Sequence, residues 1–185
     1  MTYVTLAEAR SAATSRWATK SLAESALRTA AAAPTSTDYD IFLSHSHEDA
    51  QVIAGVKTLL EHEGVTVYVY WAEEDQAAPV TAATAAKLRV RMNHCRALIY
   101  ASSQASPKSR WMPWELGYFD GRKPGRVAIM PLPSSGSTFV GQEYLGLYPH
   151  LERILWDTGR RSLGISTGAR TAKNLSAFIR DGATL

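Results

Sequence analysis

The feature that most constrains the fold is an alternation of short apolar runs with amphipathic stretches. The runs "YDIFLS" (39–44), "VTVYVYW" (65–71) and "CRALIYAS" (95–102) are rich in β-branched and aromatic residues, as buried strands are. Between the first two lies a helical pattern, 47–64, with apolar residues on one face. Strands that alternate with helices predict a parallel sheet covered by helices on both faces.

Two further runs complete the expected sheet. "RVAIMPLP" (126–133) and "ERILWD" (152–157) are the fourth and fifth strands, and "TAKNLSAFIRDG" (171–182) is a closing helix. We therefore predict an α/β, flavodoxin-like, three-layer fold with a five-stranded parallel sheet.

The first part of the chain differs in composition from the rest. Residues 1–36 are rich in Ala, Ser and Arg, a bias shared with targeting segments. Leu6, Ala9, Ala13 and Trp17, however, follow helical spacing, which favours a docked or self-associating helix over a targeting segment. We expect a helical extension and linker over 1–36 and one domain over 37–185.

Composition excludes several classes of protein. The chain is 45% hydrophobic and 20% charged, with a net charge of +3 and no dominant basic cluster, which disfavours nucleic acid as a partner. Its one cysteine, Cys95, excludes an intrachain disulfide and fits a reducing cytoplasm. No apolar run approaches the ~20 residues that span a membrane, so no membrane partner is expected.

In a parallel α/β sheet, ligands bind beyond the carboxyl ends of the strands. Here those ends read "SHSHED", "WAEEDQ", "SSQASPKS" and "LPSSGS". The residues His45, His47, Glu48 and Asp49 do not follow a known metal-ligand spacing, and we expect no metal. Cys95 begins a strand and is expected to be a core residue rather than a nucleophile.

The stretch "SRWMPWELGYFDG" (109–121) places one carboxylate, Glu115, among aromatic residues. It admits a plain reading, in which Ser109 caps a helix, Pro113 lies in the first turn and the rings are core. It also admits a functional one, because Trp111 and Glu115 lie one turn apart on one helix face. Such a pair joins a stacking surface to a carboxylate. No Rossmann, P-loop or hydrolase-elbow motif is present.

Together, "YDIFLSHSHEDA", the segment 71–80, "CRALIYASS" and "SRWMPWELGYFDG" resemble the successive motifs of a bacterial Toll/interleukin-1 receptor (TIR) domain, over about 39–157. The chain is similar to the stand-alone TIR proteins of Thoeris-type antiphage defence. The resemblance implies cleavage of NAD+ at the nicotinamide–ribose bond, with Glu115 as the catalytic residue. It also implies these substrate-binding residues: Ser44, His45, Ser46, Trp71, Glu73, Glu74 and Trp111.

Further expectations follow from the resemblance. NAD+ is a substrate, so no cofactor is expected; the product is ADP-ribose or a cyclic isomer, which a separate effector protein would sense. Self-association through TIR–TIR contacts is also implied. The alternative is a non-catalytic TIR interaction module. A phosphoreceiver is not expected, because it would carry an acidic pair directly after the first strand and an aspartate at the end of the third, where this chain reads "SHSHED" and "YASS". Ser44 and His45 stand where some members carry arginines, and Met112 and Pro113 where many have a cysteine after the tryptophan.

Overall fold

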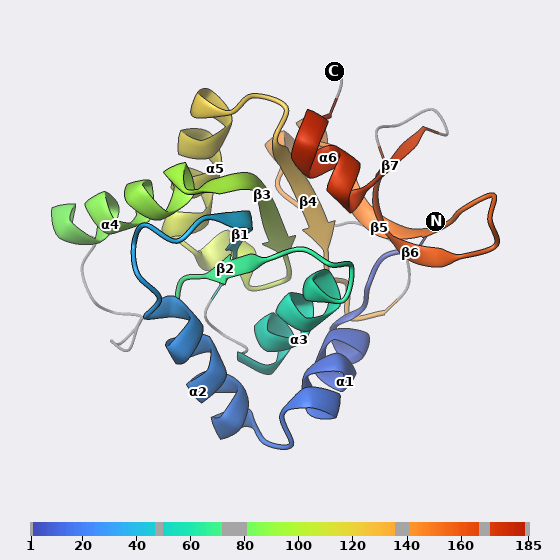
Figure 1. The fold of residues 1–185 in the computed structure, drawn as a ribbon, viewed down its shortest axis with the longest axis horizontal. Coiled ribbons are helices and arrows are strands. Elements are labelled where there is room, and N and C mark those ends of the chain that lie inside the picture. The colour runs from blue at the N-terminus through green and yellow to red at the C-terminus, as the bar shows by residue number, and fades with distance from the viewer. Residues whose placement is uncertain (1, 47–49, 72–80, 136–140, 167–170, 184–185) are drawn as a thin grey trace.

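The protein folds around one seven-stranded sheet, seen in a computed structural model that describes residues 2–46, 50–71, 81–135, 141–166 and 171–183 (Figure 1). The strand order is β2-β1-β3-β4-β5-β6-β7. The strands are β1 (Tyr39–Ser44), β2 (Val67–Val69), β3 (Cys95–Ser102), β4 (Val127–Pro131), β5 (His150–Leu155), β6 (Arg161–Ser166) and β7 (Ala172–Asn174).

The five predicted strands are all present and run parallel to one another, so the predicted α/β class is confirmed. The predicted strand number was wrong, because β6 and β7 extend the sheet in antiparallel orientation. A tight turn joins β5 to β6: Trp156 and Arg160 are hydrogen-bonded through their backbones, and Gly159 has a φ of 79°. A left-handed residue at this turn favours glycine and lets the chain return beside β5.

Helices cover both faces of the sheet. One face carries α1, α2, α3 and α6, and the other carries α4 and α5. The α-helices are α1 (Leu6–Arg16), α2 (Lys20–Ala31), α3 (Ala50–Glu61), α4 (Ala82–Asn93), α5 (Trp111–Arg122) and α6 (Leu175–Asp181), with short 3₁₀ helices η1 (Ser106–Lys108) and η2 (Glu143–Leu147). None of the described helices is long and apolar enough to cross a membrane.

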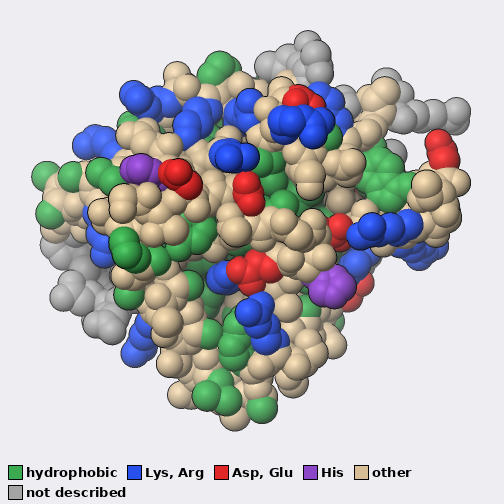
Figure 2. All heavy atoms as spheres, viewed as in Figure 1, with side chains coloured by type: hydrophobic (Ala, Val, Ile, Leu, Met, Phe, Trp, Pro, Cys, Tyr) green, Lys and Arg blue, Asp and Glu red, His purple; other side chains and the backbone are tan. Residues whose placement is uncertain are grey.

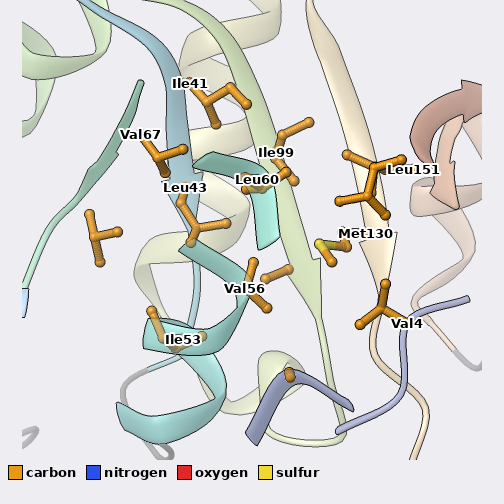
Figure 3. Packing of buried hydrophobic residues seen from close by; sticks show 14 of the residues in the cluster. Val4, Ile41, Leu43, Ile53, Val56, Leu60, Val67, Ile99, Met130 and Leu151 are labelled. Carbon is orange, nitrogen blue, oxygen red and sulfur yellow. The ribbon is translucent and has the colours of Figure 1, made fainter. Parts of the chain in front are cut away.

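Side-chain alternation along the strands divides the core into two halves. On β1, Ile41 and Leu43 pack on the α3 side with Ile99 and Met130 (Figure 3). Phe42 packs on the opposite side, against α4 and α5. Successive strand residues point to opposite faces, so the residue after Leu43 points toward α5. That residue is Ser44.

The N-terminal helices pack on the α3 side of the core. Val4, Ala9 and Ala13 are buried there, and α1 lies beside α3 (Figure 1). The backbones of the two helices approach so closely that a Cβ on Gly55 of α3 would lie 1.7 Å from the carbonyl oxygen of Ala9. Only glycine permits that approach. The spacing of Ala9 and Ala13 thus belongs to a helix that packs against α3.

Basic side chains gather at the top of the view in Figure 2, the edge where β3 and β4 begin. Two of the basic residues at the strand beginnings close helix ends. Lys123 donates to the carbonyl oxygens of Met92 and Asn93 at the end of α4. The guanidinium of Arg126 donates to the backbone carbonyl oxygen of Arg180 on α6. Cations at helix C-termini are stabilised by the unpaired carbonyls there. Lys123 and Arg126 therefore have a structural role, at the edge opposite the strand carboxyl ends.

Candidate active site

Glu115 lies in the second turn of α5, with its side chain toward the carboxyl end of β1. The N-cap of this helix is Arg110, one residue after the predicted Ser109, and its side chain makes no capping hydrogen bond. Ser109 Oγ nevertheless accepts a hydrogen bond from the backbone N–H of Met112, and Pro113 lies in the first turn, where no backbone donor is needed. Met112, Leu116 and Phe119 anchor the helix in the α5 half of the core. Their burial directs Glu115, on the same side of the helix, inward.

The carboxylate of Glu115 is buried, at 5% exposure, and holds a hydrogen bond from Ser44. The Ser44 hydroxyl donates to Glu115 Oε2 at 2.6 Å, a short distance typical of a charged acceptor. Burial raises the pKa of Glu115 to about 7, while the Ser44 hydrogen bond opposes that rise. The carboxylate is therefore able to change protonation near neutral pH. Such groups are candidates for catalysis.

The aromatic residues around Glu115 form one row along α5. Trp111 lies one turn before Glu115, is half-buried, and contacts Trp114 edge on, with ring centroids 5.4 Å apart. Trp114 in turn stacks on Tyr118, with ring centroids 5.7 Å apart. Arg89 of α4 lies over the Trp114 ring at 5.4 Å. Trp111 is the first residue of α5 and hence the member of this row nearest the carboxyl edge of the sheet, one helical turn from the carboxylate.

The three residues predicted to follow β1 as one substrate-lining segment have three different surroundings. Ser44 contacts Glu115, whereas the His45 ring stacks on Trp71 with centroids 5.6 Å apart. The Nε2 of His45 lies 3.1 Å from the carbonyl oxygen of Tyr70. Ser46 lines a pocket on the α3 side of the sheet. His45 and Trp71 are thus joined to each other, and the predicted residues Glu73 and Glu74 lie outside the described residues.

Tyr100 is a site residue that the sequence analysis missed. It is buried near the carboxyl end of β3, and Tyr144 lies beside its hydroxyl. Burial raises the pKa of Tyr100, and the nearby Tyr144 and Glu115 add to that rise. Strand alternation held the signal, because Tyr100 shares the α5-facing register with Leu98. A neutral phenol therefore lies close to the buried carboxylate.

Two other predictions concern metal and thiol chemistry. Among the described residues, no cluster of His, Cys, Asp and Glu is able to hold a metal ion. His47, Glu48 and Asp49 lie outside the described residues. Cys95 is buried at the start of β3, and burial raises the pKa of its thiol to about 12. A thiol that stays protonated is a poor nucleophile, so Cys95 is a core residue, as predicted.

Residues 41–143, over half of the chain, match the family model of the TIR domain. The chain belongs to the TIR-domain family. The match contains most of β1 and all of α3, β2, α4, β3, α5 and β4, and thus both residues of the Ser44–Glu115 contact. The N-terminal helices of this TIR protein lie before the matched region.

Two curated TIR relatives resemble the chain. It is 50% identical over 119 residues to the "Probable 3' cyclic ADP-D-ribose synthase ThsB'" of Bacillus cereus (strain MSX-D12). The aligned residues make up 62% of this chain and 61% of the relative. It is 25% identical over 83 residues to the "Putative cyclic ADP-D-ribose synthase TIR2" of Cytobacillus dafuensis, and these residues make up 43% of this chain and 22% of the relative. The matched region thus spans less than two thirds of either relative.

Proposed function

We propose that this TIR protein cleaves the nicotinamide–ribose bond of NAD+, with Glu115 as its catalytic carboxylate. The observation that carries the proposal is the buried Glu115 side chain, held by Ser44 at the strand edge where α/β proteins bind ligands. The W-x-x-x-E spacing of Trp111 and Glu115 and the names of the two relatives support the same chemistry. NAD+ is then a substrate and not a resident cofactor.

One carboxylate suffices for this reaction. When the C–N bond breaks, its electron pair stays on the ring nitrogen, so nicotinamide leaves as a neutral molecule and needs no acid. The positive charge moves onto the ribose carbon, as in the oxocarbenium-like transition states of glycoside hydrolysis. An ionised Glu115 in a buried position stabilises that charge more strongly than it would in water. Trp111 is placed to stack on a flat ring of the substrate.

We further propose that the acceptor is a hydroxyl of the same molecule, which gives a cyclic ADP-ribose. The hydroxyl oxygen bonds to the ribose carbon and releases one proton, so the product lacks the elements of water that hydrolysis would add. The support is that both relatives are named as cyclic ADP-D-ribose synthases. The product would act as a signal for a separate effector protein in antiphage defence.

We also propose that two copies of the chain build the complete site, with the segment Trp71–Pro79 of one copy covering Glu115 of another. His45 holds Trp71 at the carboxyl edge of β1, which supports a role for this segment at the site. Specific activity is then expected to rise with protein concentration. Mixing Glu115→Ala chains with chains that lack 72–79 should restore part of the activity. Constant specific activity of a protein that light scattering shows to be monomeric would contradict this.

The decisive experiment is incubation of the protein with NAD+ and identification of the products by mass spectrometry. We expect nicotinamide and a product lighter than ADP-ribose by one water. Glu115→Gln should abolish both products while circular dichroism shows an unchanged fold. A well-folded wild-type protein that leaves NAD+ intact, whether dilute or concentrated, would favour the alternative of a non-catalytic interaction module.

A further inference from the structure

A pocket of about 280 Å³ lies at the carboxyl ends of β1 and β3, on the α3 side of the sheet. Ser46 lines it just after β1, and Ala101 and Ser103 line it at the end of β3. β1 and β3 are neighbours in the sheet. After β1 the chain continues to β2 at one edge, whereas after β3 it continues to β4 in the opposite direction. The pocket therefore lies at the topological switch point, where α/β sheets of this order bind ligands.

The N-terminal helix α1 forms one wall of this pocket. Leu6 and Arg10, four residues apart and hence on the same face of α1, both line it. The packing of α1 on α3 fixes that wall, because the Gly55 backbone lies directly against Ala9. Residues before 41 lie outside the TIR match. The extension therefore adds a wall to the binding edge that the matched region does not supply.

The lining combines an apolar floor with a polar rim. Val52, Ile53 and Leu132 are buried and form the floor, and Figure 3 shows Ile53 at the end of the core near α1. Gln104 and the exposed Arg10 provide an amide and a cation, and none of the described lining residues is acidic. An apolar floor suits a flat ring, and guanidinium groups bind phosphate in bidentate geometry.

The pocket is close to the carboxylate of Glu115, although the two lie on opposite sides of the sheet. Ser44, which contacts Glu115, and Ser46, which lines the pocket, are separated by at most about 7 Å of chain. A volume of 280 Å³ is at the lower limit of pockets for drug-sized ligands, roughly 300 Å³. The pocket thus suits part of a dinucleotide, and the remainder would reach across the strand edge.

We propose that this pocket is a nucleoside-phosphate site, in which the apolar floor receives the base and Arg10 of α1 binds the phosphate. Two sources have this chemistry: the ADP half of NAD+ and a separate adenine nucleotide. The first source rests on the proposed function. The site itself does not, because its chemistry follows from the lining alone.

Calorimetric titration of the wild-type protein with AMP, and with adenosine as the phosphate-free probe, tests the site. Arg10→Ala should weaken AMP binding by about tenfold and leave adenosine binding unchanged. Arg16→Ala is the matched control, since it removes the same charge from the same helix but at a residue outside the pocket lining. Ala105→Trp, which places a large ring in the pocket, should prevent binding of both probes.

Inhibition kinetics then distinguish the two sources. If AMP raises the KM for NAD+ and leaves kcat unchanged, the pocket holds the ADP half of the substrate. If AMP changes kcat at saturating NAD+, the pocket holds a separate nucleotide. The proposal is overturned if AMP does not bind, or if Arg10→Ala and Ala105→Trp both leave its affinity unchanged. A protein that does not cleave NAD+ but binds AMP in this Arg10-dependent way would refute the proposed function and retain the site.

Discussion

Glu115→Gln removes a buried negative charge and preserves the shape of the side chain. The amide oxygen of glutamine is able to accept the hydrogen bond that Ser44 donates to Oε2 in the wild type. The substitution therefore leaves the packing of α5 nearly unchanged and eliminates the cost of burying an ionised carboxylate. We expect a protein that is inactive and more stable.

The magnitude follows from the pKa of Glu115, which is about 7 in the folded protein against an ordinary value of 4.5. A raised carboxyl pKa means that the folded state binds the proton more tightly than the unfolded state. Stability is therefore lost as the pH rises from about 4.5 to about 7. By linkage, the loss is about 1 kcal/mol at pH 5 and about 3 kcal/mol at pH 8. Glu115→Gln should recover that loss.

Urea unfolding of both proteins at pH 5 and pH 8, followed by circular dichroism, measures this difference. The variant should be more stable by about 3 kcal/mol at pH 8, with a much smaller gain at pH 5. Glu143→Gln is the control, because it neutralises an exposed carboxylate on η2 and should change stability little at either pH. An equal stability difference at the two pH values would show that Glu115 is not a buried, pH-dependent charge.

Three further predictions concern the neighbours of Glu115 and the docking of α1. Ser44→Ala removes the hydrogen bond that lowers the pKa of Glu115, so the acid limb of kcat/KM should move to higher pH; an unmoved pH profile would exclude this role. Trp111→Ala should lower kcat/KM by about tenfold or more, while Trp111→Phe should retain a measurable part; equal unfolding of both by circular dichroism would make Trp111 a core residue. Gly55→Ala forces a methyl group against the Ala9 carbonyl and should destabilise the protein by about 1–3 kcal/mol or more in urea unfolding; unchanged stability would contradict the close packing of α1 on α3.

The parallel part of the fold was predictable because its strands are apolar and separated by helical periodicity. The strand 95–102 was predicted with its observed bounds, since both of its faces are buried. The antiparallel strands were not predicted for two reasons. β6 follows a five-residue hairpin connection rather than a helix, and its alternating pattern, with Leu163 and Ile165 buried, is short. β7 has the sequence AKN, which has little intrinsic strand preference and depends on pairing with β6.

The position of Glu115 at the carboxyl edge was predictable, but its environment was only partly so. Strand alternation was sufficient to place Ser44 on the α5 side, because Ile41 and Leu43 point the other way. No local pattern indicated that His45 would stack on Trp71 or that Ser46 would line a pocket with α1. Those contacts join segments that are distant in sequence. The pocket at Ser46 depends on how the N-terminal helix packs, and no short sequence motif indicates that packing.

The burial that costs stability at Glu115 is also what makes the carboxylate effective in the proposed reaction. In the unliganded protein, a pKa of about 7 means that both the protonated and the ionised side chain are populated near neutral pH. The nicotinamide ring of NAD+ carries a positive charge, and a cation placed beside a carboxylate lowers its pKa. Substrate binding would therefore ionise Glu115. The negative charge would then be complete when the ribose carbon becomes cationic, in surroundings where water screens it little. Ser44 contributes to this balance, since its hydrogen bond limits the rise in pKa and keeps the ionised form accessible.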